Sequence, residues 1–173
     1  MILEEHVALN GHVFQRWRVH PSIILGGFIF SPEDWQHLHN DFGIQSVINV
    51  CIEQSDEGKG ISHLAQCPVP DNGEQFPLGL VRHAVAFAQI HHGRGPIYVH
   101  CALGNSRSPA FAYAILRWVF DMTIGEAIGL IRAGKPGAAQ YGSHPVQQSY
   151  LRSVESTLTL LRSKNVPLSE QIG

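Results

Sequence analysis

Residues 98–108 read Tyr98-Val99-His100-Cys101-Ala102-Leu103-Gly104-Asn105-Ser106-Arg107-Ser108, and this stretch predicts the centre of the fold. Residues 96–100 are short, apolar and β-branched, which indicates a buried strand, and the apolar run 109–120 predicts a buried helix directly after it. Residues 101–107 are therefore expected to form the turn between them. A loop that feeds a helix N-terminus points free backbone N–H groups at one spot, where the helix dipole adds partial positive charge. We expect an anion to bind there.

The side chains of this loop suit a phosphate group. Gly104 permits the backbone torsions that such a cradle needs, and Arg107 can offer two parallel N–H donors to phosphate oxygens. The same surroundings favour the thiolate of Cys101, which becomes a nucleophile beside the bound phosphate. Ser108 can donate a hydrogen bond to that sulfur or cap the helix. His100 faces away from the loop in an alternating strand, so it either braces the loop backbone or is an ordinary buried histidine.

The run from His100 to Ser108 resembles the signature His-Cys-x5-Arg-Ser/Thr of the cysteine-dependent protein tyrosine phosphatase superfamily, and within it the small (atypical) dual-specificity phosphatase group. The resemblance spans roughly residues 20–160. It implies a phosphatase that acts through a phosphocysteine intermediate, with Cys101 as nucleophile and Ser108 assisting its departure. The implied phosphate-binding set is Ala102, Leu103, Gly104, Asn105, Ser106 and Arg107.

A phosphatase of this kind also needs an acid, because expelling an alkoxide or phenoxide from phosphorus is slow unless the leaving oxygen is protonated. Residues 67–73, CPVPDNG, leave an apolar strand and enter a turn rich in Pro, Asn and Gly. The resemblance implies that the acid comes from this loop, and Asp71 is the residue that matches it. Glu74 is the alternative acid, and Asp71 could instead only bond its own backbone in the turn.

Two further cysteines lie outside the signature. Cys51 ends a predicted strand, and its position resembles that of the second cysteine which some lipid and protein phosphatases of the superfamily place behind the nucleophile. The resemblance implies a redox partner that could trap oxidised Cys101 as a disulfide. The alternative, and the expectation for Cys67, is that a buried free cysteine acts as a small apolar residue.

The order of apolar segments predicts an α/β fold class: a single domain with a central, mostly parallel twisted sheet of four to five strands flanked by helices. Strands are predicted at 23–30, 44–51, 62–69 and 96–100. Helices are predicted from Ser31-Pro32, at 77–92, at 109–120, from the capping box at Thr123 to about 133, and at 144–163.

Composition supports one domain over residues 1–173, with its core at about 20–163, because 173 residues with 44% hydrophobic composition can bury a full core. The net charge of −2 gives no reason to expect nucleic acid. No signal peptide or bilayer-spanning run is apparent, so we expect a soluble, cytoplasmic enzyme without stable membrane insertion. The eleven histidines have no metal-ligand spacing, and we expect neither a metal nor a cofactor.

The sequence defines the substrate less closely than it defines the reaction. Residues 102–106 contain no Lys or Arg, which disfavours a polyanionic inositol lipid, and the family resemblance implies proteins carrying phosphotyrosine, phosphoserine or phosphothreonine. A singly phosphorylated lipid or small metabolite is the enzymatic alternative, and a non-catalytic phosphate-binding module is a third reading. Arg132 and Lys135 either contact a second anionic group or are solvated charges at a helix C-terminus.

Overall fold

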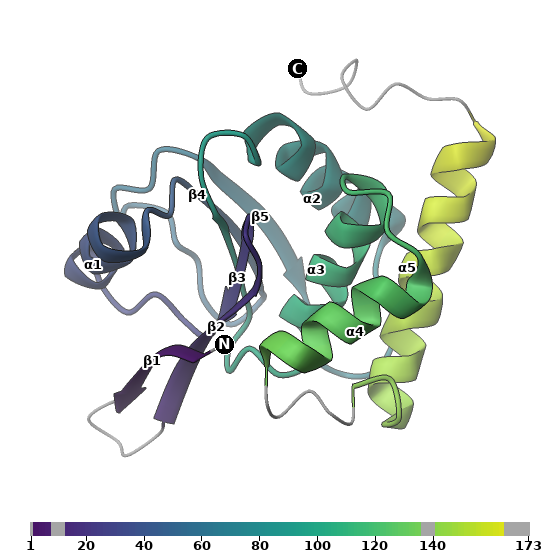
Figure 1. Ribbon diagram of the computed structural model, residues 1–173, viewed down its shortest axis with the longest axis horizontal. Coiled ribbons are helices and arrows are strands. Elements are labelled where there is room, and N and C mark those ends of the chain that lie inside the picture. Colours follow the sequence, from purple (N-terminus) through teal and green to yellow (C-terminus); the bar gives the residue numbers. More distant parts are fainter. Residues whose placement is uncertain (1, 8–12, 136–140, 165–173) are drawn as a thin grey trace.

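The computed structural model describes residues 2–7, 13–135 and 141–164 and has a central sheet with helices on both faces (Figure 1). Its six strands lie in the order β1-β2-β3-β6-β4-β5. They are β1 (Ile2–Val7), β2 (Val13–His20), β3 (Ile23–Gly26), β4 (Ser46–Cys51), β5 (Leu64–Val69) and β6 (Ile97–His100). The helices are α1 (Pro32–Phe42), α2 (Leu78–His91), α3 (Arg107–Trp118), α4 (Ile124–Gly134) and α5 (Pro145–Ser163).

The sheet confirms the predicted α/β class. Strands β3, β6, β4 and β5 are parallel neighbours, whereas β1 and β2 add an antiparallel pair beside β3. All four strands located from the sequence are present, but β1 and β2 were missed, so the sheet has six strands where four to five were expected. The signal that could have located β2 is the alternation of its buried Trp17 and Val19 with Arg16 and Arg18.

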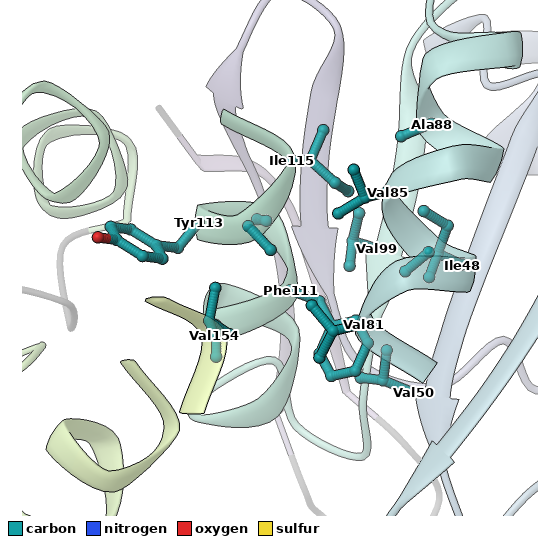
Figure 2. Packing of buried hydrophobic residues seen from close by; sticks show 14 of the residues in the cluster. Ile48, Val50, Val81, Val85, Ala88, Val99, Phe111, Tyr113, Ile115 and Val154 are labelled. Carbon is teal, nitrogen blue, oxygen red and sulfur yellow. The ribbon is translucent and has the colours of Figure 1, made fainter. Parts of the chain in front are cut away.

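Side chains of the parallel strands alternate between two cores. One core packs against α2, α3 and α5, as Figure 2 shows for part of it, and takes Ile23, Leu25, Ile48, Val50, Ile97 and Val99. The other packs against α1 and takes Ile24, Val47 and Tyr98. Each fully buried aliphatic side chain of this kind contributes about 1.5–3 kcal/mol to folding. Because Tyr98 lies on the α1 side, the alternation also directs His100 to that side and Cys101 to the opposite one.

The predicted helix starts are confirmed where a capping residue precedes the helix. The Ser31 side chain accepts a hydrogen bond from the Asp34 N–H, and Thr123 and Glu126 form a complete capping box. Helix α3 begins at Arg107, two residues earlier than its apolar run indicates, with Ser106 at the N-cap position. In the described part of the chain, none of the helices combines the length and apolarity needed to cross a membrane.

Strand β3 ends at Gly26, short of the 23–30 range expected from the sequence. A Cβ atom at Gly26 would lie 2.1 Å from the Tyr98 hydroxyl oxygen, so only glycine lets this backbone pass the ring. The Tyr98 hydroxyl donates to the Gly27 carbonyl at 2.7 Å. Beyond β3 the chain turns away and packs against the loop that follows β6.

Candidate active site

The loop after β6 is held between its own strand and the segment that follows β3. The Phe28 N–H donates to the Ala102 carbonyl at 3.2 Å. Gly104 has φ +76°, and a Cβ atom there would lie 2.9 Å from the Gly26 carbonyl group. Both the backbone torsion and the close approach therefore require glycine at this position. The Leu103 side chain, in contrast, is 47% exposed.

The sulfur of Cys101 lies under this loop, and the residue is only 2% exposed. The Gly104 N–H donates to Sγ at 3.2 Å, and the Ser108 hydroxyl lies 3.4 Å from it. The N-cap position of α3 belongs to Ser106, so the alternative role of Ser108 as the cap is wrong. A backbone N–H, a hydroxyl and the start of the 12-residue helix α3 thus surround this sulfur.

Arg107 is the first residue of α3, and its guanidinium is 2% exposed. Its Nη1 donates to Glu53 Oε2 at 2.8 Å and to the Val69 carbonyl at 2.9 Å. The hydrogen bond from Arg107 lowers the pKa of Glu53. Arg107 Nε is buried and makes no hydrogen bond with any residue that the structure describes. The guanidinium is thus fixed at one corner while a donor remains for another acceptor.

Asp71 lies across the loop from Arg107, with its Oδ2 at 3.7 Å from Arg107 Nε. The Ser106 hydroxyl lies 3.0 Å from each carboxylate oxygen, and the Tyr150 hydroxyl donates to Oδ1 at 2.9 Å. These bonds tie Asp71 to the loop rather than to its own turn. The alternative acid, Glu74, has an exposed side chain, and its N–H bonds Asn72 within the turn.

An open depression of about 360 Å³ adjoins the carboxylate of Asp71. Its lining comes from three segments: Asp71 from the loop after β5, Ser106 from the loop after β6, and His144 and Gln147 from the start of α5. The depression therefore opens beside both the Asp71 carboxylate and the loop after β6.

His100 is fully buried behind the loop, stacked on the Tyr98 ring with centroids 5.4 Å apart. Its Nε2 lies 2.5 Å from Asp56 Oδ2, and its Nδ1 lies 3.3 Å from the Cys101 carbonyl oxygen. Lys59 donates to the other Asp56 oxygen at 2.7 Å. Burial opposes the charge of Asp56, yet hydrogen bonds from His100 and Lys59 leave its pKa below the ordinary value. His100 is therefore both a satisfied core histidine and a contact of the loop backbone.

The two basic residues at the end of α4 have different surroundings. Lys135 is only 3% exposed, its Nζ donates to Asn105 Oδ1 at 2.7 Å, and it lies 4.5 Å from the centre of the Trp17 ring. Burial lowers the pKa of Lys135 to about 8, against the opposing attraction of Cys101. Arg132 instead donates to the Tyr141 carbonyl. Lys135 is thus a cation of the site and not a solvated charge, whereas Arg132 belongs to the helix end.

Cys51 ends β4 at the same edge of the sheet where Cys101 follows β6, because Asn49 pairs with His100 in the parallel register. Both cysteines are buried and free. Burial, with the nearby Cys101 as a second cause, raises the pKa of Cys51. Cys67 has no exposed surface, and burial raises its pKa to about 12.

Sequence reasoning missed Glu53, Asp56 and Tyr150. Both Glu53 and Asp56 follow β4, the strand next to β6. Asp56 lies within residues 54–60, which have the sequence of an exposed polar loop, and Glu53 lies directly before them. An acidic residue shortly after a parallel strand adjacent to the nucleophile strand is the signal that could have indicated Glu53. Tyr150 gives no such signal, because its apolar ring fits the buried face of α5.

Comparison with known proteins shows a phosphatase family for this chain. A family model described as dual specificity phosphatase, catalytic domain, matches residues 29–147. A mouse putative dual specificity phosphatase complexed with zinc tungstate is 20% identical, with a TM-score of 0.69 over 87% of this chain and 90% of that one. Human DUSP28 is 20% identical, with a TM-score of 0.68 over 85% and 95% of the two chains. PTPMT1 in complex with PI(5)P is 18% identical, with a TM-score of 0.62 over 83% and 96%.

Proposed function

This chain belongs to the dual specificity phosphatase family and is a cysteine-based phosphatase, and from that premise we propose that its substrates are phosphoproteins carrying phosphotyrosine, phosphoserine or phosphothreonine. We propose further that residues of about 20–163 form one catalytic domain. The observation that carries the proposal is the convergence at one edge of the sheet of a hydrogen-bonded cysteine sulfur, a fixed guanidinium and an aspartate.

In the first proposed step, the Cys101 thiolate attacks phosphorus and the bond from phosphorus to the leaving oxygen breaks. Asp71 gives its proton to that oxygen, so the leaving group departs as a neutral alcohol or phenol. Arg107 and the backbone N–H groups of residues 102–107 hold the equatorial phosphate oxygens. The product of this step is a phosphocysteine at Cys101 and an ionised Asp71.

In the second step, water attacks phosphorus and gives a proton to the Asp71 carboxylate, while the sulfur–phosphorus bond breaks. The Ser108 hydroxyl, 3.4 Å from Sγ, donates to the departing thiolate and stabilises its charge. Inorganic phosphate leaves, and Cys101 and Asp71 return to the protonation states in which they started. The cycle uses only side chains of this chain and water.

The phosphoprotein assignment is supported by the family and by the loop itself. Residues 102–106 carry no Lys or Arg, and among the described residues Lys135 donates to Asn105 of this loop from outside it. So few cations suit a single phosphate better than a polyanionic headgroup. The alternative substrate, a singly phosphorylated lipid or small metabolite, is supported by the similarity to PTPMT1, whose solved complex contains PI(5)P.

Turnover of p-nitrophenyl phosphate tests the catalytic proposal, and the third reading, a non-catalytic phosphate-binding module, predicts binding without turnover. A panel of phosphotyrosine, phosphoserine and phosphothreonine peptides, monophosphorylated lipids in vesicles and small phosphometabolites then tests the substrate class. We expect the highest kcat/KM with phosphopeptides. A clear preference for a phospholipid or a metabolite would overturn the phosphoprotein assignment while leaving the phosphatase chemistry intact.

The Asp71→Asn variant is expected to lower kcat by about 10²-fold or more for phenyl phosphate, whose leaving group needs a proton, and by less for p-nitrophenyl phosphate. The limb of the pH profile that falls as a carboxylic acid deprotonates should disappear. Steady-state rates from pH 4 to pH 9 measure both effects, and Glu74→Gln is the matched control. Loss of that limb in Glu74→Gln but not in Asp71→Asn would assign the acid to Glu74.

For Cys51 we propose the redox role implied by its position behind the nucleophile. Mild peroxide should inactivate the enzyme reversibly and link the Cys51 and Cys101 peptides, whereas Cys51→Ser should proceed to irreversible sulfinic or sulfonic acid at Cys101. Peptide mass spectrometry before and after thiol reductant measures this, with Cys67→Ser as control. Over-oxidised Cys101 alone, or a bridge to Cys67, would leave Cys51 as a plain buried residue.

A further inference from the structure

Helix α5 holds the loop that carries Asp71 through a row of hydrogen bonds. The Ser149 hydroxyl donates to the Gly73 carbonyl at 2.5 Å, and the Phe76 N–H donates to the Ser153 hydroxyl at 2.8 Å. The Tyr150 ring stacks on Phe76, with centroids 4.3 Å apart and planes 23° from parallel. The backbone of the loop that carries Asp71 is thus bonded to α5 at Ser149 and Ser153, on either side of Tyr150. These bonds do not involve the Asp71 side chain.

The direction of the Tyr150 hydroxyl proton follows from its two partners. The Gly73 N–H, which can only donate, lies 3.1 Å from the Tyr150 oxygen, so that oxygen accepts there. Its single hydrogen is left for Asp71 Oδ1 at 2.9 Å. Burial raises the pKa of Tyr150 to about 12, with Asp71 as a further cause, so the hydroxyl keeps its proton throughout the neutral range.

The bond to Tyr150 also fixes how the Asp71 carboxyl group is rotated. With Oδ1 held by Tyr150, Oδ2 lies 3.7 Å from Arg107 Nε, on the side of the carboxyl group that faces the guanidinium. The other charged or titratable groups around Asp71 are Glu53, which reaches it through Arg107, and His144 across the depression. Tyr150 and Ser106 are both hydroxyl donors to the carboxylate, so hydrogen bonds hold its orientation from two sides.

We propose that Tyr150 is a positioning residue for the reaction, which orients the Asp71 carboxyl toward the leaving oxygen through the hydrogen bond from its hydroxyl. The inference rests on the proposed function, because it assigns Tyr150 a role only through Asp71. Within the described residues, the hydrogen bonds of the Tyr150 hydroxyl go to Asp71 and Gly73 of the same loop. Its effect is therefore expected in the proton transfer and not in phosphate binding.

The Tyr150→Phe variant keeps the ring on Phe76 and removes only the hydroxyl. We expect kcat for phenyl phosphate to fall about 2- to 10-fold, the range that loss of one hydrogen bond allows, with a smaller loss for p-nitrophenyl phosphate. Removal of a hydrogen-bond donor disfavours an ionised carboxylate in general, so the alkaline limb of the kcat/KM profile should move to higher pH by about 0.5 to 1 unit in the variant. Inorganic phosphate should inhibit both proteins equally.

Two controls separate this role from simple loosening of the loop. Ser149→Ala removes a bond from α5 to Gly73 without touching Asp71, so its alkaline limb should stay in place. In an Asp71→Asn background, Tyr150→Phe should cause no further loss, because both substitutions act on one proton transfer. An unmoved limb in Tyr150→Phe, an equal loss for both leaving groups, or an undiminished loss in the double variant would overturn the inference.

Failure of the proposed function gives a different result. If the wild-type chain turns over no phosphomonoester, or if Asp71→Asn keeps its alkaline limb, the function or the acid assignment is wrong. If Asp71→Asn loses the limb and Tyr150→Phe retains it unshifted, only the role of Tyr150 is wrong.

Discussion

Cys101→Ser is expected to lower kcat by at least about 10⁴-fold while the protein still binds phosphate or tungstate. The hydroxyl of serine is a far weaker nucleophile than a thiolate, and the Gly104 N–H and the Ser108 hydroxyl that contact Sγ in the described structure are not bases. Arg107, the backbone N–H groups and the start of α3 remain, so the oxyanion cradle survives the change. Turnover of p-nitrophenyl phosphate and calorimetric binding of the oxyanion measure the two quantities separately.

Cys67→Ala is the matched control, because Cys67 is also buried and free but lies on β5. We expect it to keep wild-type kcat apart from some loss of stability on heating. Activity of Cys101→Ser comparable with that of the wild type would end the covalent mechanism. Loss of oxyanion binding together with turnover would instead indicate that the cysteine supports the loop structurally.

The second large effect is expected for Arg107→Lys, with kcat/KM reduced by about 10²- to 10³-fold. The guanidinium is held by Glu53 and the Val69 carbonyl through Nη1, which leaves its other edge for two parallel bonds to phosphate. An ammonium group cannot make both contacts at once. The loss should appear mostly in kcat, since the two-pronged contact tightens as charge spreads over the equatorial oxygens of the transition state.

Arg94→Lys is the control for a general loss of guanidinium, because Arg94 precedes β6, at the strand end opposite to the loop, and contacts His63 on an exposed surface. It should leave kcat/KM unchanged. A reduction of only a few-fold in Arg107→Lys would show that the charge alone suffices and that the bidentate contact is not used.

Local signals explain why so much of the fold could be predicted. The strand, loop and helix around Cys101 could be predicted because an apolar run, a glycine-containing loop and a second apolar run follow one another within about 25 residues. Ser31 and Thr123 located two helix starts by their capping chemistry. The start of α3 was misplaced because its first residues, Arg107 and Ser108, are polar, and their side chains contact Glu53 and Cys101.

The parts that the sequence did not reveal depend on contacts between distant residues. Tyr150 reaches Asp71 across 79 positions, and Arg107 reaches Glu53 across 54. Such pairs leave no periodic pattern, because each member fits its own element equally well without the partner. Lys135 shows the same limitation: at the end of a helix it reads as a solvated charge, and only the packing of α4 against β2 brings it to Asn105.

The covalent intermediate is the central claim, and trapping it is the most direct test. Ser108→Ala should slow departure of the sulfur more than attack on the substrate, so the phosphorylated enzyme should accumulate during turnover. We expect acid quenching within the first turnovers, followed by peptide mass spectrometry, to find phosphate on Cys101 and on no other residue. Continued release of phosphate from the substrate without any phosphorylated Cys101 peptide, or with phosphate on a different side chain, would contradict the account.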